Sequence, residues 1–191
     1  MGTARKALRL ATRVAGMINV EYKYLDQNYT ASIIDYNGGL NSSLCSPAQG
    51  VGVSEREGDS IKVKNVTIKG AWKYNGDDSI CRMIVFYDPD NTISSVSEFL
   101  DTVGSSLAVY ANRNQTYKFS AKTLLDHSIS ITADNPIRQF KHVVNIDNHT
   151  NFTPAGTTII KGAIKLLVIS QAVTVNVPLF EYTTHATYVD N

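Results

Sequence analysis

The chain has 191 residues and a mass of 21.0 kDa, of which 43% are hydrophobic and 18% charged. This length suits one domain with a buried core, and the composition excludes an intrinsically disordered chain. The two cysteines, Cys45 and Cys81, are too few for a disulfide scaffold or a four-cysteine zinc site. No apolar run approaches the length of a membrane-spanning helix, so we expect no membrane partner.

The first 20 residues are expected to form a basic arm distinct from the rest of the chain. Four of the 18 basic residues lie within residues 1–16, which contain no acid, and this leaves 14 basic against 17 acidic residues elsewhere. With a helical period, the apolar side chains of residues 4–18 cover one side. The cationic residues gather on the other side: Arg5, Lys6, Arg9 and Arg13. The pattern predicts an amphipathic helix that is interrupted or ends near Gly16.

Three interpretations of this arm compete. It could be an ordinary helix packed on its own domain, a nucleic-acid arm whose guanidinium groups meet phosphates, or a membrane-surface or targeting helix. The absence of serine and the direct continuation into the body argue against a targeting peptide. The one-sided, acid-free stripe favours nucleic acid. Four charges cannot read a base sequence and bind weakly, so useful affinity needs many arms acting together.

Beyond the arm, the chain reads as β-strands separated by turn signals. Strands are predicted for residues 29–36, 60–73, 80–87, 117–132, 139–146, 157–170 and 174–189. In the second of these runs, Ile61 and Val63 share one face. Val66 and Ile68 share the other, which predicts a bulge near Lys64 if all four face the core.

Three further features complete the predicted fold. Residues 37–58 read as a long loop, and Thr92–Val103 shows a helical repeat that Ser94 or Ser95 could cap. Pro178 argues for an edge or a break in the last strand. About eight strands with intervening turns indicate a single all-β sandwich or jelly-roll domain over residues 21–191.

Enzyme signatures are absent from the sequence. It contains no G-x-S-x-G, Walker, Rossmann, H-E-x-x-H or C-x-x-C motif, and its four histidines fall on different predicted elements. Both cysteines read as small buried residues rather than reactive thiols. Asp88 and Asp90 flank Pro89 and read as turn formers, with calcium binding as the alternative. We therefore expect no catalytic role.

Several segments, taken in order, suggest a family. After the basic arm come Arg56-Glu57-Gly58-Asp59 at the start of a strand, Arg82-Met83-Ile84-Val85-Phe86-Tyr87-Asp88, a helix, and a closing Tyr188-Val189-Asp190. This order resembles the coat proteins of satellite tobacco necrosis virus and similar capsid proteins of small single-stranded DNA viruses. The resemblance covers nearly the whole chain, although residues 104–170 match only in pattern.

The resemblance implies an eight-stranded viral jelly roll with an N-terminal basic amphipathic helix and one short internal helix. It implies a homo-oligomer, a T=1-type icosahedral shell in a virion. There, Arg5, Lys6, Arg9 and Arg13 would contact packaged single-stranded RNA or DNA. Lys62, Lys64 and Lys69 could add to the inner surface, because the first two lie opposite Ile61 and Val63 on their strand.

The resemblance also implies calcium between subunits. Carried over by residue, one site would use the carboxylates of Glu21 and Asp190 with the backbone carbonyls of Glu57 and Ser60. The alternative is that both acids are solvated near chain ends. A second family site needs an acid where this chain has Val51, so we do not expect that site.

The sequence thus predicts a viral coat protein that assembles and performs no catalysis. Two other classes stay open: a jelly-roll carbohydrate- or ligand-binding module that forms no shell, and a small enzyme whose site is assembled from scattered residues. Particle mass separates these classes, since only a shell reaches megadaltons.

Overall fold

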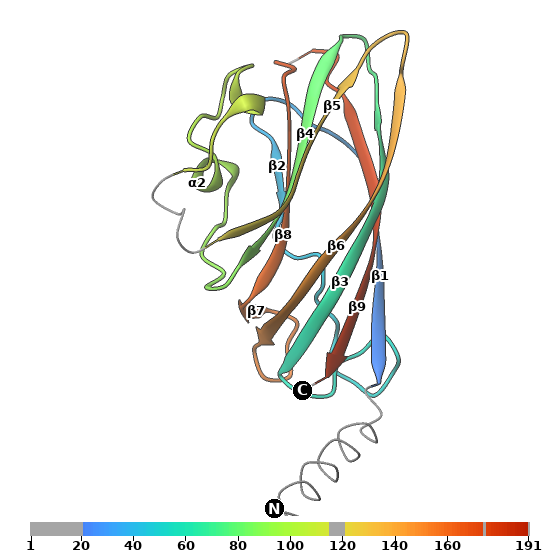
Figure 1. Ribbon diagram of the computed structural model, residues 1–191, viewed down its shortest axis with the longest axis vertical. Helices are drawn as coiled ribbons and strands as arrows, with labels where there is room; N and C mark the ends of the chain where they lie inside the picture. Colours follow the sequence, from blue (N-terminus) through green and yellow to red (C-terminus); the bar gives the residue numbers. More distant parts are fainter. Residues whose placement is uncertain (1–20, 115–120, 174, 191) are drawn as a thin grey trace, which may run out of the picture.

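A computed structural model describes residues 21–114, 121–173 and 175–190, which fold into two facing antiparallel sheets (Figure 1). Sheet A consists of β1 (Tyr22–Ile33), β9 (Leu179–Asp190), β3 (Ser60–Lys73), β6 (Ile137–Phe152) and β7 (Ile159–Lys161), in that order. Sheet B consists of β2 (Gly39–Asn41), β8 (Ala163–Ser170), β4 (Ser79–Asp88) and β5 (Lys122–Ile131).

The strand order is that of a jelly roll. Apart from the three-residue β7, each sheet has four strands, β1-β9-β3-β6 and β2-β8-β4-β5, and successive strands repeatedly cross between the sheets. All neighbouring strands pair antiparallel. The prediction of an all-β jelly roll is confirmed. The predicted basic arm, with Arg5, Lys6, Arg9 and Arg13, lies outside the described residues.

The core lies between the sheets and follows from the alternation of apolar residues. Ile61, Val63, Val66 and Ile68 of β3 are all fully buried. A register shift between Val63 and Asn65 against both neighbouring strands brings the two pairs onto one face, which confirms the predicted bulge. Cys45 and Cys81 are buried in this core, and burial raises the pKa of each thiol to about 12. Burial therefore favours the protonated thiol at both positions, which fits the prediction of small buried residues.

Several boundaries differ from the predictions. β1 begins at Tyr22, not at residue 29, and β2 lies inside the predicted loop of residues 37–58. The run at 157–170 is two strands in different sheets, because the chain crosses from β7 to β8 at Gly162. β9 starts directly after Pro178, as a break predicts, but it is a central strand and not an edge.

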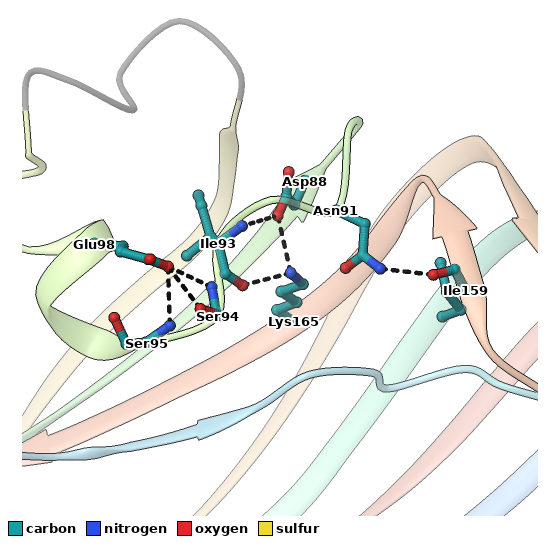
Figure 2. Close-up of polar contacts among 8 residues, drawn as sticks. All are labelled: Asp88, Asn91, Ile93, Ser94, Ser95, Glu98, Ile159 and Lys165. Atoms are coloured by element: carbon teal, nitrogen blue, oxygen red, sulfur yellow. Dashed lines mark hydrogen bonds and ion pairs between the residues drawn. The ribbon is translucent and has the colours of Figure 1, made fainter.

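The predicted helix at 92–103 is much shorter in the structure. It contains only α2 (Val96–Phe99), followed by a 3₁₀ turn, η1 (Ala108–Tyr110). Ser95 is the N-cap, and the Glu98 carboxylate accepts hydrogen bonds from the backbone N–H groups of Ser94 and Ser95 at 2.5 and 3.2 Å (Figure 2). The apolar residues of the predicted helical repeat still pack together, since one buried cluster contains Ile93, Val96, Phe99 and Leu100.

Residues 89–114, between β4 and β5, cover sheet B on the side away from sheet A (Figure 1). They form a second apolar core with residues that alternate along β4 and β8, among them Ile84, Phe86, Leu167 and Ile169. This arrangement explains the Arg82–Asp88 motif, whose alternate residues face the covering segment.

Polar contacts fix both ends of that segment. Arg82 donates to the backbone carbonyls of Val109 and Ala111 and forms a two-point ion pair with Asp126. At the other end, Asp88 accepts from Lys165 Nζ at 2.9 Å and from the Ile93 N–H at 2.8 Å (Figure 2). Asp88 begins the turn that the sequence predicted, because its backbone carbonyl accepts a hydrogen bond from the Asn91 N–H at 3.4 Å. It is fully buried in an ion pair.

Candidate nucleic-acid interface and cation site

The outward face of sheet A carries a row of lysines. The bulge in β3 keeps its apolar residues inward, so its outward residues include Lys62, Lys64, Lys69 and Lys73. On the neighbouring strand β6, the exposed Lys141 lies directly opposite Lys69. We call these five residues the lysine face. No described segment covers it, whereas the 89–114 segment covers the outer face of sheet B.

Acids neutralise both ends of the lysine face and leave its middle cationic. Asp147 lies 3.2 Å from Lys62 Nζ and 2.7 Å from Lys64 Nζ. The hydrogen bond with Lys64 lowers the pKa of Asp147 and raises that of Lys64. Lys73 pairs with Glu181 at 2.6 Å. Among the described residues, no carboxylate lies within ion-pair distance of Lys69 or Lys141.

Polar side chains surround Lys69. A hollow of about 220 Å³ on this face is lined by Asp26, Asn28, Thr67, Lys69, Thr183, Thr184 and His185. His185 Nδ1 lies 2.7 Å from Asp26, and the half-exposed Tyr24 ring stacks on its imidazole with centroids 5.8 Å apart. Two like charges placed opposite each other weaken a sheet. The pair Lys69 and Lys141 suits a surface that meets an anion, because phosphate offers each ammonium the negative partner that the described residues do not.

The residues of the predicted calcium site lie near one another at the end of the sandwich where β1 begins and β9 ends. Tyr22 pairs with Val189, and Ile61 pairs with Asp190. Glu21 is exposed, and the Glu57 carbonyl accepts a hydrogen bond from Gln49 at 3.0 Å. Among residues 21–114, 121–173 and 175–190, no three His, Cys, Asp or Glu side chains gather as metal ligands.

A residue to which the sequence analysis gives no role, Lys23, lies between the acids of this site. The ammonium of Lys23 lies 3.0 Å from Glu57 Oε1 and 2.8 Å from Asp190 Oδ2, and Lys23 is only 2% exposed. The hydrogen bond with Asp190 raises the pKa of Lys23 more than burial lowers it. A divalent ion about 4 Å from an ammonium would be repelled by about 8 kcal/mol at an effective dielectric constant of 20. The calcium site stays a prediction, and Lys23 competes with it.

The first half of the Arg56–Asp59 motif has a structural explanation. Arg56 is fully buried, and its guanidinium lies 4.4 Å from the centre of the Phe152 ring. It donates hydrogen bonds to the backbone carbonyls of Gly58, Thr153 and Gly156. This arginine ties the loop before β3 to the turn after β6. It therefore holds Glu57 in place beside Lys23.

A larger hollow opens at the side of the sandwich where β1 and β2 are neighbouring edges. It has a volume of about 540 Å³, and its lining includes Tyr29, Asn41, Phe180 and Tyr182. Tyr29 and Tyr182 stack with centroids 4.3 Å apart, and Asn41 donates to the Tyr182 hydroxyl at 2.7 Å. In the described part of the chain, no helix is long and apolar enough to cross a membrane.

Comparisons with known proteins find similar folds at low similarity. No family model and no curated protein matches the chain. One similar structure is from Desmodium yellow mottle tymovirus, with a TM-score of 0.40, 10% identity and coverage of 90% of this chain and 87% of that one. Another is a virus-like particle of the nodavirus of the giant freshwater prawn Macrobrachium rosenbergii, with a TM-score of 0.36, 8% identity and coverage of 88% and 93%.

A third similar structure is a Clostridium thermocellum xylanase with CBM22-1 and GH10 modules, bound to xylohexaose. Its TM-score is 0.29, with 11% identity and coverage of 91% of this chain and 27% of that one. TM-scores below 0.5 carry no argument about function. The jelly-roll assignment rests on the strand order, and membership of the satellite tobacco necrosis virus family stays a prediction.

Proposed function

We propose that this chain is a viral coat protein that assembles into a small icosahedral shell of the T=1 type and packages a single-stranded nucleic acid. The lysine face carries the proposal. It is a cation-bearing surface that no described segment covers, on one sheet of a jelly roll whose other sheet is covered by residues of its own chain. In a closed shell, the lysine face of such a sandwich is suited to line the inner cavity.

The arm and the lysine face supply the same chemistry. Arg5, Lys6, Arg9 and Arg13 lie in a stretch without acids, directly before the described part of sheet A. A few cations per chain bind phosphate weakly, but a closed symmetric array brings many of them to one cavity. Contacts to phosphate do not select bases, so RNA and DNA are both suitable cargo.

Particle mass and nucleic-acid content test this proposal together. We expect the purified chain to elute as a megadalton particle in light scattering and to show hollow shells in electron microscopy. Deletion of residues 1–14 should lower the 260/280 nm absorbance ratio of the particles and leave the β-sandwich folded by circular dichroism. A protein that stays a protomer in all salt conditions contradicts shell assembly. An unchanged absorbance ratio contradicts the role of the arm.

The hollow beside β1 and β2 favours one alternative, a carbohydrate- or ligand-binding module. Its lining combines aromatic rings with amide and hydroxyl groups, which is the chemistry that binds sugars. A soluble oligosaccharide that perturbs Tyr29 and Tyr182 in NMR spectra of a protomer would support this alternative. Megadalton particles that bind no oligosaccharide would contradict it.

A further inference from the structure

We propose that the ammonium of Lys23 is a built-in cation that joins three distant segments of one chain, in the place where the family resemblance expects calcium. The segments are the start of β1, the loop before β3 and the end of β9. The inference concerns the stability of the chain itself and does not depend on shell assembly.

The position of Lys23 is unusual for a lysine near a strand end. Its neighbours Tyr22 and Tyr24 are exposed on the outward face of sheet A, so the alternation of β1 turns Lys23 inward. Its side chain is 3% exposed, whereas those of Glu57 and Asp190 are 60% and 20% exposed. Lysine is almost never fully buried without a charged partner. The two ion pairs are what allow this lysine to point inward.

Glu57 lies in the loop before β3, and Asp190 lies at the end of β9. Among the described residues, no other ion pair links either segment to the start of β1. Glu57 follows the buried Arg56, which fixes the loop, and Asp190 lies at the end of a strand that pairs with both β1 and β3. Lys23 therefore links a loop and a chain end to the first strand. A metal ion that bridges carboxylates would make the same link.

The ammonium and a calcium ion exclude each other here. The predicted calcium site needs the Asp190 carboxylate, and Lys23 Nζ already lies 2.8 Å from that carboxylate and 3.0 Å from the one of Glu57. Calcium wants six to eight oxygen ligands, and among the described residues no three His, Cys, Asp or Glu side chains gather to hold a metal ion. Without the lysine side chain, the same two carboxylates would be left without a counter-charge, and a divalent ion could take its place.

Thermal melting of three full-length proteins, each in millimolar calcium and in excess chelator, tests this inference. We expect the unmodified chain to melt at the same temperature in both. Lys23→Ala should melt lower in chelator by at least about 5 °C and recover part of that loss in calcium. Lys64→Ala is the matched control: it removes a partly exposed lysine that is also paired with a carboxylate, and it should change little in either condition.

Three results would overturn the inference. A fall in the melting temperature of the unmodified chain on chelation would mean that a metal, not Lys23, holds this end. Equal melting of Lys23→Ala and Lys64→Ala would mean that Lys23 makes no important link. Failure of calcium to restore Lys23→Ala would show that the ammonium does not stand in for an ion. If Lys23→Ala does not fold, Asp190→Asn replaces it and should melt lower than the unmodified chain, equally in calcium and in chelator.

The measurement keeps this inference separate from the proposed function. Melting reports on the chain whether or not it forms particles, so a protein that stays a protomer can still confirm the role of Lys23. Conversely, megadalton particles that fall apart in chelator would support the coat-protein proposal and contradict this inference.

Discussion

Asp88 and Lys165 form an ion pair that is almost completely removed from solvent, with exposures of 0% and 2%. Lys165 also donates to the Ile93 carbonyl at 2.6 Å, and Asp88 accepts from the Ile93 N–H, so the pair fixes the first residues of the segment that covers sheet B. A buried pair contributes little net stability compared with apolar residues. Removal of one partner, however, leaves a charge buried without compensation.

We therefore predict that Lys165→Met destabilises the chain by about 3–5 kcal/mol, since it leaves the Asp88 carboxylate alone in the interior. The double change Lys165→Met with Asp88→Leu should recover much of this loss. Chemical unfolding gives the free energies, and Lys73→Met, which removes a half-exposed partner of Glu181, serves as the control with a cost of about 0–1 kcal/mol. A loss as small for Lys165→Met as for the control would contradict the prediction.

At the scale of elements, strands with a clear apolar alternation could be predicted, whereas the short β2 and the start of β1 could not. Residues 60–73 show an alternation strong enough to give β3 and its bulge. β2 has only three residues, too few to show an alternation of apolar and polar side chains. It is defined by its pairing with β8. The start of β1 was missed because an inward lysine breaks the apolar alternation. Lys23 becomes interpretable only once its partners, distant in sequence, are in place.

The crossing at Gly162 depends on a conformation that sequence reasoning did not detect. Gly162 has φ +75°, and a Cβ there would lie 2.0 Å from the His149 carbonyl oxygen. We predict that Gly162→Ala costs more than about 2 kcal/mol in chemical unfolding. Gly104 has φ +83°, but a Cβ there would meet only Asn37 Oδ1 at 3.9 Å, so Gly104→Ala should cost only about 1–2 kcal/mol of left-handed strain. A cost for Gly162→Ala no larger than that of Gly104→Ala would show that the close approach is relieved cheaply.

At the scale of the whole molecule, the two sheets differ in what covers them, and this difference decides which surface can meet a polyanion. Sheet B is closed by its own chain, whereas the described residues leave the outward face of sheet A open, with Lys69 and Lys141 opposite each other. If the coat-protein proposal is right, this face contributes to packaging in addition to the basic arm. Its contribution should be electrostatic and independent of base sequence.

We predict that Lys69→Glu, alone or with Lys141→Glu, weakens binding of single-stranded nucleic acid and lowers the magnitude of its salt dependence. Loss of one phosphate contact reduces the slope of log affinity against log salt by about 0.7 on single strands. Fluorescence titration of a labelled oligonucleotide over a salt series measures both quantities. Lys122→Glu is the control, because it changes the net charge equally at an exposed position on sheet B. Equal effects of Lys69→Glu and Lys122→Glu would mean that overall charge, and not the lysine face, governs binding.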